Sequence, residues 1–270
     1  MTLKEAEKIL AEAGIGSARG EARKIFHSLG KVPEYELFSP DCKSESEAVA
    51  AAVIRRSHRE PLQYILGEVD FYRETYRVTP AALIPREDTE LLVDYAVNNL
   101  PSGAVFLDLC TGSGCVALST LKNTEKTTAI AVDISKKAID LARENATRLG
   151  LCDRIELLVR DALTDFYEGE IFAVLSNPPY VASEVYKTLQ KEIFFEPREA
   201  FVGGDDGGDF YRKISEIYKD KISRDGFIAF EIGYDQRGLL EKIAEKVGMS
   251  LAVQKDLSGN DRVAVLRRIK

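Results

Sequence analysis

From residue 104 onward, short apolar runs alternate with segments of helical character, and this alternation restricts the fold more than any other feature. The apolar runs are rich in β-branched or aromatic residues and lie at 104–109, 128–133, 155–159, 171–176, 226–232, 249–254 and 262–269. The predicted helices lie at 115–121, 135–149, 208–223 and 236–247. Parallel strands that helices cover on both faces produce this pattern. We therefore predict an α/β domain with a seven-stranded, doubly wound sheet that carries one antiparallel strand at its edge. The last two strands are expected to be joined by a short turn at 258–261.

The first seventy residues contain no clear strand and predict a small helical domain. Apolar side chains recur at helical spacing over 3–13 and over 48–54. Asp41 or Ser44 is expected to start the later helix, and Pro61 is expected to interrupt it.

An alternating stretch at 71–78 then indicates a β-hairpin, and a helix over 89–100 is expected to open the larger domain. The predicted divisions are a helical domain (1–70), a hairpin linker (71–84) and the α/β domain (85–270).

The composition is typical of a soluble globular protein, with 45% hydrophobic and 30% charged residues. No apolar run approaches the roughly 18 residues that span a membrane, and the N-terminus lacks the apolar core of a secretory signal. We therefore expect a cytoplasmic protein. The four cysteines form no C-x-x-C pair and there are only two histidines, which argues against a metal site. The net charge of −7 argues against a partner that is mainly nucleic acid.

Residues 107–118, LDLCTGSGCVAL, combine the end of a predicted strand with a glycine-rich turn. Gly112 and Gly114 allow the backbone to turn tightly and to approach a ligand at the N-terminus of the next helix. Asp133 ends the second predicted strand about 20 residues later, where its carboxylate can hold both hydroxyls of a ribose. The loop by itself fits NAD and S-adenosylmethionine equally well, and a tight turn without a ligand is a third interpretation.

A second polar group follows the third predicted strand, at Asp161 and Ala162. Ligands of doubly wound folds lie outside the carboxyl ends of the strands, so this pair is a candidate contact. An aspartate in such a position is more often a helix cap than a ligand contact.

The fourth predicted strand ends in SNPPY, residues 176–180, which is the most specific signal in the chain. Pro178 and Pro179 remove two backbone donors and hold the chain in an extended bend. A planar NH₂ group can donate one hydrogen to the Asn177 side-chain oxygen and another to the Pro178 carbonyl, beside the aromatic face of Tyr180. The nitrogen then faces an electrophilic methyl group, and positioning supplies much of the rate. Nothing in the motif suits a hydride acceptor, which argues against a dehydrogenase; a plain Asn-Pro-Pro turn is the alternative.

The Asn-Pro-Pro-Tyr motif resembles that of the class I amino-methyltransferases, whose target amine belongs to adenine, cytosine or glutamine. Further segments look like the release-factor glutamine methyltransferase family, also called HemK-type: PLQYILGEVDFY (61–72), ALIPREDTE (82–90), EPREAFVGGDDGGDFYRKI (196–214), FEIG (230–233) and DLSGNDRV (256–263). The resemblance runs from about residue 60 to the end, and the helical N-terminal part has the family's size and position. It implies a class I methyltransferase (Rossmann-like) fold and S-adenosylmethionine as the cofactor.

The resemblance also implies an activity and a partner. The activity is methyl transfer to the side-chain amide nitrogen (N5) of the glutamine in the GGQ motif of bacterial class I peptide chain release factors. We expect a monomer that uses direct in-line displacement, with no covalent enzyme intermediate and no general base. The helical domain is expected to recognise the release factor. Residues 181–209 are interpreted as a mobile lid or docking loop, with a plain surface loop as the alternative.

Carried over by position, the resemblance assigns the site residues. The expected cofactor-binding residues are Cys110, Thr111, Gly112, Ser113 and Gly114 for the methionine part, Asp133 for the ribose, Asp161 and Ala162 near the adenine, and Asn177. The expected substrate-binding residues are Asn177, Pro178, Pro179, Tyr180 and Phe71, of which Asn177, Pro178 and Tyr180 are the expected catalytic residues. Arg86 and Glu231 lie in family-like segments and are expected to form a structural ion pair.

One residue departs from the family pattern, and a further similarity leaves the acceptor protein open. Many family members have glycine at the position of Cys110, and cysteine adopts left-handed dihedrals less easily. The segment DLCTGSGC is also similar to sister enzymes that methylate a glutamine of a ribosomal protein. An adenine methyltransferase of nucleic acid is a further alternative, which the acidic composition and the lack of Trp disfavour. A binding module without catalysis is the alternative that is not an enzyme.

Overall fold

The computed structural model describes residues 1–39 and 42–269. The chain divides into two compact units. The first unit comprises Met1–Glu68 and Gln190–Phe195, and the second comprises Val69–Leu189 and Glu196–Lys270. In the part of the chain that is described, no helix is both long enough and apolar enough to cross a membrane.

The first unit is helical, as its sequence pattern predicts. Its helices are α1 (Leu3–Glu12), α2 (Ala18–Gly30), η1 (Glu34–Phe38), α3 (Glu47–Ser57), α4 (Leu62–Leu66) and η4 (Lys191–Phe195). Thr2 and Glu5 form a capping box that satisfies backbone donors at the start of α1. Helix α3 begins after Ser46, so the predicted start at Ser44 is wrong, and Asp41 lies outside the described residues. Apolar faces of α1, α2 and α3 form one core around Leu10, Phe26 and Val53.

A β-hairpin begins where the first unit ends. Its strands are β1 (Glu68–Phe71) and β2 (Glu74–Arg77), so it starts three residues before the predicted linker 71–84. Tyr72 and Arg73 both have positive φ, 46° and 71°, which is the backbone of the two-residue turns that match strand twist. The hairpin is therefore closed by its turn backbone without a glycine.

The second unit contains a sheet of seven strands in the order β5-β4-β3-β6-β7-β9-β8. The strands are β3 (Val105–Leu109), β4 (Thr128–Asp133), β5 (Ile155–Val159), β6 (Ile171–Ser176), β7 (Ile222–Glu231), β8 (Met249–Lys255) and β9 (Asp261–Arg268). The five strands β3 to β7 run parallel, and β9 is antiparallel to both of its neighbours. The predicted doubly wound α/β fold is confirmed.

The predicted place of the antiparallel strand is wrong. Strand β9 lies one position inside the sheet, and the edge strand is β8. A short connection makes β8 and β9 antiparallel to each other, but it does not decide which of them pairs with β7. The side chains of β9 are mostly buried, whereas those of β8 are mostly exposed or half-buried. The two strands are similarly apolar in sequence, so composition alone does not predict which of them lies inside the sheet.

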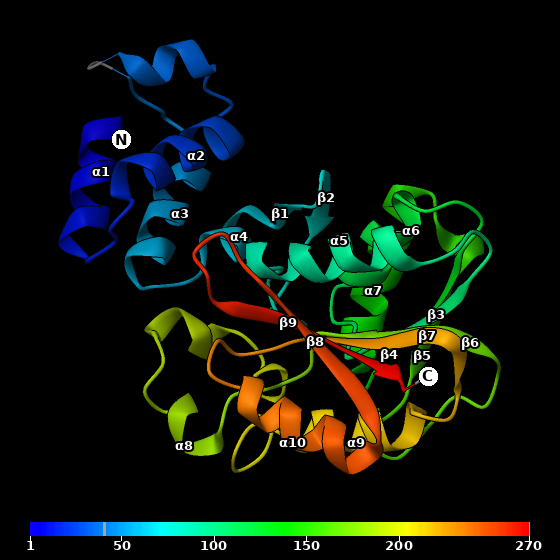
Figure 1. The fold of residues 1–270 in the computed structure, drawn as a ribbon. Coiled ribbons are helices and arrows are strands. Elements are labelled where there is room, and N and C mark those ends of the chain that lie inside the picture. The colour runs from blue at the N-terminus through cyan, green and yellow to red at the C-terminus, as the bar shows by residue number, and fades with distance from the viewer. Residues whose placement is uncertain (40–41, 270) are drawn as a thin grey trace. The chain divides into compact units, whose positions relative to one another are not determined.

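Helices cover both faces of the sheet (Figure 1). Helices α5 (Glu90–Asn99), α6 (Cys115–Lys122) and α7 (Lys136–Leu149) lie on one face, and α9 (Asp209–Tyr218) and α10 (Arg237–Val247) lie on the other. Successive strand residues alternate between the two cores, so Phe106 packs toward the first face and Leu107 toward the second. The predicted helix 208–223 is too long, because β7 already begins at Ile222 and extends four residues before the predicted strand 226–232.

The remaining helices are short and lie at connections: η2 (Glu87–Thr89), η3 (Cys152–Arg154), α8 (Ser183–Tyr186) and η5 (Arg198–Ala200). The strand order reverses between β3 and β6, which lie side by side at the centre of the sheet. In doubly wound folds ligands bind at this switch point, outside the carboxyl ends of the strands. The segments that follow β3, β4 and β6 therefore position the site.

Candidate functional site

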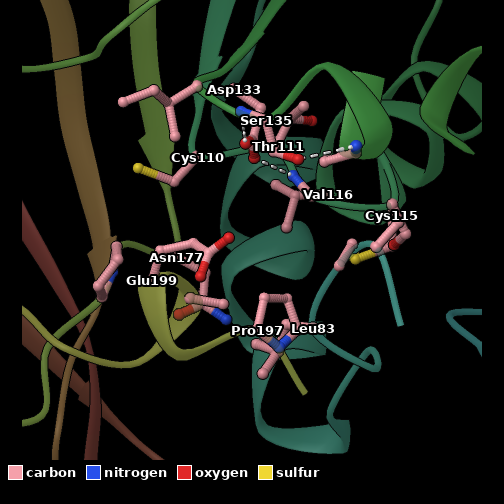
Figure 2. A pocket seen from close by; sticks show the side chains of 18 of the residues that line it. Leu83, Cys110, Thr111, Cys115, Val116, Asp133, Ser135, Asn177, Pro197 and Glu199 are labelled. Atoms are coloured by element: carbon pink, nitrogen blue, oxygen red, sulfur yellow. Dashed lines mark hydrogen bonds between the residues drawn. The ribbon is translucent and has the colours of Figure 1, made fainter. Parts of the chain in front are cut away.

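A pocket that is partly open to solvent lies at the carboxyl ends of β3, β4 and β6. Figure 2 shows Asp133 and Thr111 on one side of it and Pro197 and Leu83 on the opposite side, with Asn177 between them. Segments that are far apart in the sequence therefore form the pocket, and local hydrogen bonds shape each of them.

The loop after β3 owes its shape to a buried carboxylate. Asp108 is 1% exposed, and its Oδ2 accepts hydrogen bonds from the Thr111 hydroxyl (2.5 Å) and from the Ala117 backbone N–H (3.1 Å). Burial raises the pKa of Asp108 to about 7. Asp108 lies inside the LDLCTGSGCVAL segment, but the glycine pattern of that segment does not predict its role as an anchor.

The same loop needs left-handed backbone at three positions. Cys110, Gly112 and Gly114 have φ of 62°, 55° and 82°. Cysteine therefore occupies a conformation that glycine adopts more easily, as the resemblance suggested. Burial, with nearby carboxylates including Asp133, raises the pKa of the Cys110 thiol well above its usual value. Cys110 consequently lines the pocket as a neutral thiol.

Asp133 joins this loop to the end of β4. Its Oδ2 accepts the Gly112 backbone N–H and its Oδ1 accepts that of Ser135, each at 2.9 Å. Each carboxylate oxygen retains lone-pair capacity, so both can also accept hydrogen bonds from a ligand. Burial raises the pKa of Asp133. A carboxylate with both oxygens positioned this way suits the two adjacent hydroxyls of a ribose, so the donor and acceptor set fits an adenosine-containing cofactor.

Most predicted cofactor residues come together in the pocket. The lining includes Cys110, Thr111, Gly112, Ser113, Asp133, Asp161, Ala162 and Asn177. Gly114 is not part of the lining; a Cβ on it would lie 3.1 Å from side-chain atoms of Ala142 and Leu118, so its role is close packing of α6 against α7. The sequence analysis missed Ile134, a lining residue that is 62% exposed and follows Asp133 directly.

The opposite wall depends on another buried carboxylate. Glu196 Oε2 accepts the backbone N–H of Ile84 at 2.9 Å, and its Oε1 pairs with the Arg86 guanidinium. This ties the segment before α5 to the segment that contributes Pro197 and Glu199 to the pocket. The expected Arg86–Glu231 ion pair is therefore wrong, because the partner of Arg86 is Glu196.

Asn177 lines the pocket at the end of β6 and belongs to a hydrogen-bonded network. Its Nδ2 lies 3.2 Å from Oγ1 of Thr89, whose hydroxyl donates to Oε2 of Glu231 at 2.5 Å. Oε1 of Glu231 accepts the Tyr180 hydroxyl at 3.2 Å. Glu231 therefore contacts two polar side chains, and burial raises its pKa to about 7.

Two glycines allow a distant segment to lie against the Asn-Pro-Pro-Tyr backbone. A Cβ on Gly203 would lie 2.2 Å from the Pro179 carbonyl oxygen, and one on Gly207 would lie 2.1 Å from that of Tyr180. The Tyr180 carbonyl also accepts a hydrogen bond from Nε2 of Gln236 at 2.9 Å. These contacts stabilise the backbone of the Asn-Pro-Pro-Tyr motif at its last two residues.

Some of the predicted substrate-binding residues line the pocket and others do not. Asn177 and Pro179 line the pocket, whereas Pro178 and Tyr180 complete the bend without being part of the lining. Phe71 is wrong as a wall of this pocket: it is 2% exposed and packs edge-on against Tyr76, with ring centroids 5.9 Å apart. The hairpin turn directs this side chain into the core beneath α5 and α6.

Comparison with known proteins gives a consistent result. Residues 2–67 match the PrmC N-terminal domain family, and residues 87–208 match the methyltransferase small domain family. The chain is 38% identical over 259 residues to the release factor glutamine methyltransferase of Thermodesulfovibrio yellowstonii, which covers 93% of this chain and 92% of that protein. It is 35% identical over 260 residues to the protein of the same name from Geobacter sulfurreducens, covering 94% and 91%.

Among solved structures, a methyltransferase from Pyrococcus furiosus matches with a TM-score of 0.55 at 22% identity, over 72% of this chain and 89% of that one. At this identity the likeness concerns the fold. It agrees with the predicted class I methyltransferase architecture of the second unit.

Proposed function

Because the chain belongs to the release factor glutamine methyltransferase family, we propose that it methylates the side-chain amide nitrogen of the GGQ glutamine in class I peptide chain release factors. The chain is a protein-(glutamine-N5) methyltransferase of the kind that uses S-adenosylmethionine. The family selects glutamine as the acceptor, and one observation supports a planar NH₂ group as the target. Asn177 lines the pocket with its Nδ2 held by Thr89, which leaves its Oδ1 to accept a hydrogen bond from an amide NH₂ group.

The residues that would hold the cofactor follow from the pocket. The Asp133 carboxylate would accept the two ribose hydroxyls, and the exposed Ile134 side chain would cover an apolar face of the adenine. Asp161 and Ala162 would lie at the adenine edge, and residues 110–113 would bind the methionine part. The bound cofactor supplies an electrophilic methyl group on a sulfonium centre.

On the acceptor side, Asn177 Oδ1 and the Pro178 carbonyl would each accept one hydrogen of the glutamine NH₂ group. This arrangement would hold the nitrogen with its lone pair toward the methyl group that the cofactor supplies. The methylated amide would then lose one proton to water. Cys110 is not the nucleophile of a covalent step, because its raised pKa keeps the thiol protonated. A protonated Cys110 is consistent with the direct displacement that we propose.

We assign recognition of the release factor to the helical unit. Tyr35 and Phe38 are 75% and 72% exposed, and the Arg23 guanidinium lies 4.7 Å from the Phe38 ring centroid. Exposed aromatic side chains beside arginine are typical of protein interaction surfaces. Replacing Tyr35 and Phe38 together by serine is expected to raise the KM for intact release factor about tenfold, while turnover of a short GGQ peptide is unchanged. An unchanged KM for the intact protein would contradict this assignment.

The proposed reaction is tested by mass spectrometry of an unmethylated class I release factor incubated with S-adenosylmethionine and this protein. We expect the glutamine of GGQ to gain one methyl group, and Asn177→Ala to abolish the gain. A ribosomal protein and a nucleic acid would be incubated in parallel. Methylation of either of these in place of the release factor would overturn the acceptor while leaving the reaction type in place.

A further inference from the structure

Thr89 and Glu231 form a hydrogen-bonded network with Asn177. The binding of cofactor and substrate proposed above assigns these two residues no role. Thr89 and Glu231 are each 2% exposed, so neither exchanges its hydrogen bonds with bulk water. Thr89 lies directly before α5, and its side chain makes no cap hydrogen bond to that helix. Its hydroxyl instead connects Glu231 (2.5 Å) with Asn177 (3.2 Å).

The number of protons available for hydrogen bonding determines which group donates and which accepts in this connection. An ionised carboxylate only accepts hydrogen bonds, and a threonine hydroxyl has one proton to donate. When Thr89 donates to Glu231, its oxygen can only accept from Asn177. The part of the Asn177 amide that faces Thr89 must then be the NH₂ group, and its oxygen must face away from Thr89.

We propose that Thr89 and Glu231 are positioning residues that hold the Asn177 amide in a single orientation, with its NH₂ group on Thr89 and its oxygen toward the acceptor glutamine. This inference rests on the proposed function, in which Asn177 Oδ1 accepts a hydrogen of the glutamine amide. A flipped Asn177 would present NH₂ to NH₂, which repels the acceptor. Thr89 lies at the pocket wall beside Asn177, whereas Glu231 is not part of the lining.

The hydrogen bonds from Asn177 to Thr89 and from Thr89 to Glu231 form a relay, and its direction depends on the charge of Glu231. Tyr180 donates to Oε1 of Glu231, and Asp88 and Arg262 are the charged groups that act on the carboxylate, with opposite effects on its pKa. Arg262 is itself paired with Asp88 at 3.1 Å. Above pH 7 Glu231 is ionised and the direction of the relay is set. Below pH 7 it is protonated and can donate to Thr89, which frees the Thr89 proton for Asn177 Oδ1 and permits the flipped amide.

Kinetics of the full-length protein test the relay with matched variants. Thr89→Val keeps the shape and removes both hydrogen bonds, and it is expected to lower kcat by about 10- to 100-fold. Thr89→Ser keeps the hydroxyl and should retain kcat within about threefold. Cofactor affinity should change by less than about threefold in both, which separates positioning from loss of fold. Equal kcat values for the valine and serine variants would overturn the proposal.

The pH profile supplies a readout that packing alone would not move. In the wild type, kcat should fall as pH decreases through about 7, the value to which burial raises the pKa of Glu231. In Glu231→Gln the side chain no longer titrates, so this limb should disappear. An acidic limb that persists unchanged in Glu231→Gln would contradict the relay.

A spectroscopic measurement makes the relay testable without turnover. The side-chain ¹⁵N–H signals of Asn177 can be identified by their loss in Asn177→Ser and followed from pH 5.5 to 8.5. We expect a shift with a midpoint near pH 7 in the wild type, and none in Thr89→Val or Glu231→Gln. If the wild type methylates no glutamine, the proposed function fails, but this titration still decides the relay. Signals that do not titrate in the wild type would overturn it.

Discussion

The two halves of the pocket are built in different ways. In the cofactor half, Gly112 is hydrogen-bonded to Asp133 across 21 residues, and Ser113 to Asn145 across 32. In the amide half, Asn177 contacts Thr89 across 88 residues, and Thr89 contacts Glu231 across 142. The contacts of the first half therefore join neighbouring β-α units, whereas those of the second form only once distant parts of the sheet have come together.

The glycines of the two halves differ in the same way. Gly112 is needed for the backbone of its own turn, because it has φ of 55° and its Cβ position is in only ordinary contact with a neighbour. Gly203 does not have positive φ and is needed because the Pro179 carbonyl oxygen lies 2.2 Å from its Cβ position. A motif read along the sequence reveals the first kind of requirement, and only a three-dimensional contact reveals the second.

The largest expected effect, on kcat, comes from removing the Asn177 side chain in the amide half. Asn177→Ala removes the acceptor for the glutamine NH₂ group and is expected to lower kcat by about 100- to 1000-fold, as loss of a preorganised polar contact does in other enzymes. Cofactor affinity should change less than about tenfold. The matched control is Asn98→Ala, whose exposed side chain donates a hydrogen bond to the Asp94 carbonyl within α5. A large loss of cofactor affinity with unchanged kcat would place Asn177 in the cofactor half.

The next effect concerns the support of the motif. Gly207→Ala combines φ of 75° with a Cβ only 2.1 Å from the Tyr180 carbonyl oxygen, and should lower the free energy of unfolding by about 3 kcal/mol. Gly238→Ala, on α10 with open space around its Cβ position, should instead be neutral or raise that free energy by up to about 1 kcal/mol. Denaturant titration measures both. Equal effects of the two substitutions would show that Gly207 has no special contact.

A smaller effect is expected from the cofactor half. Asp133→Asn replaces one carboxylate oxygen by an NH₂ group, so one backbone N–H loses its acceptor and a ribose hydroxyl loses its partner. Affinity for S-adenosylmethionine should fall about 10- to 100-fold, or roughly 1.4 to 2.8 kcal/mol, with kcat at saturating cofactor nearly unchanged. Calorimetric titration measures this, with the exposed Asp153→Asn as control. Unchanged affinity would remove Asp133 from the cofactor site.

The smallest effect tests the unusual position in the loop. Cys110→Gly should leave cofactor affinity unchanged and alter the free energy of unfolding by less than about 1 kcal/mol, because glycine adopts φ of 62° readily. Cys110→Val should lower that free energy by about 1 to 2 kcal/mol, since left-handed backbone is costly for a β-branched residue. Thermal unfolding distinguishes the two. A glycine variant that no longer binds cofactor would mean that the thiol itself contacts it.

The sequence by itself determined the alternation of strands and helices, the glycine-rich loop with Asp133, and the Asn177–Tyr180 motif. These depend on side-chain periodicity and on the φ preferences of glycine and proline, which are properties of adjacent residues. The tertiary structure alone decided that β9 lies inside the sheet, that Phe71 packs in the core, and that Arg86 pairs with Glu196. It also decided that Glu231 lies behind Asn177. Each of these depends on which distant segments the order of the strands brings together, and no local preference encodes that order.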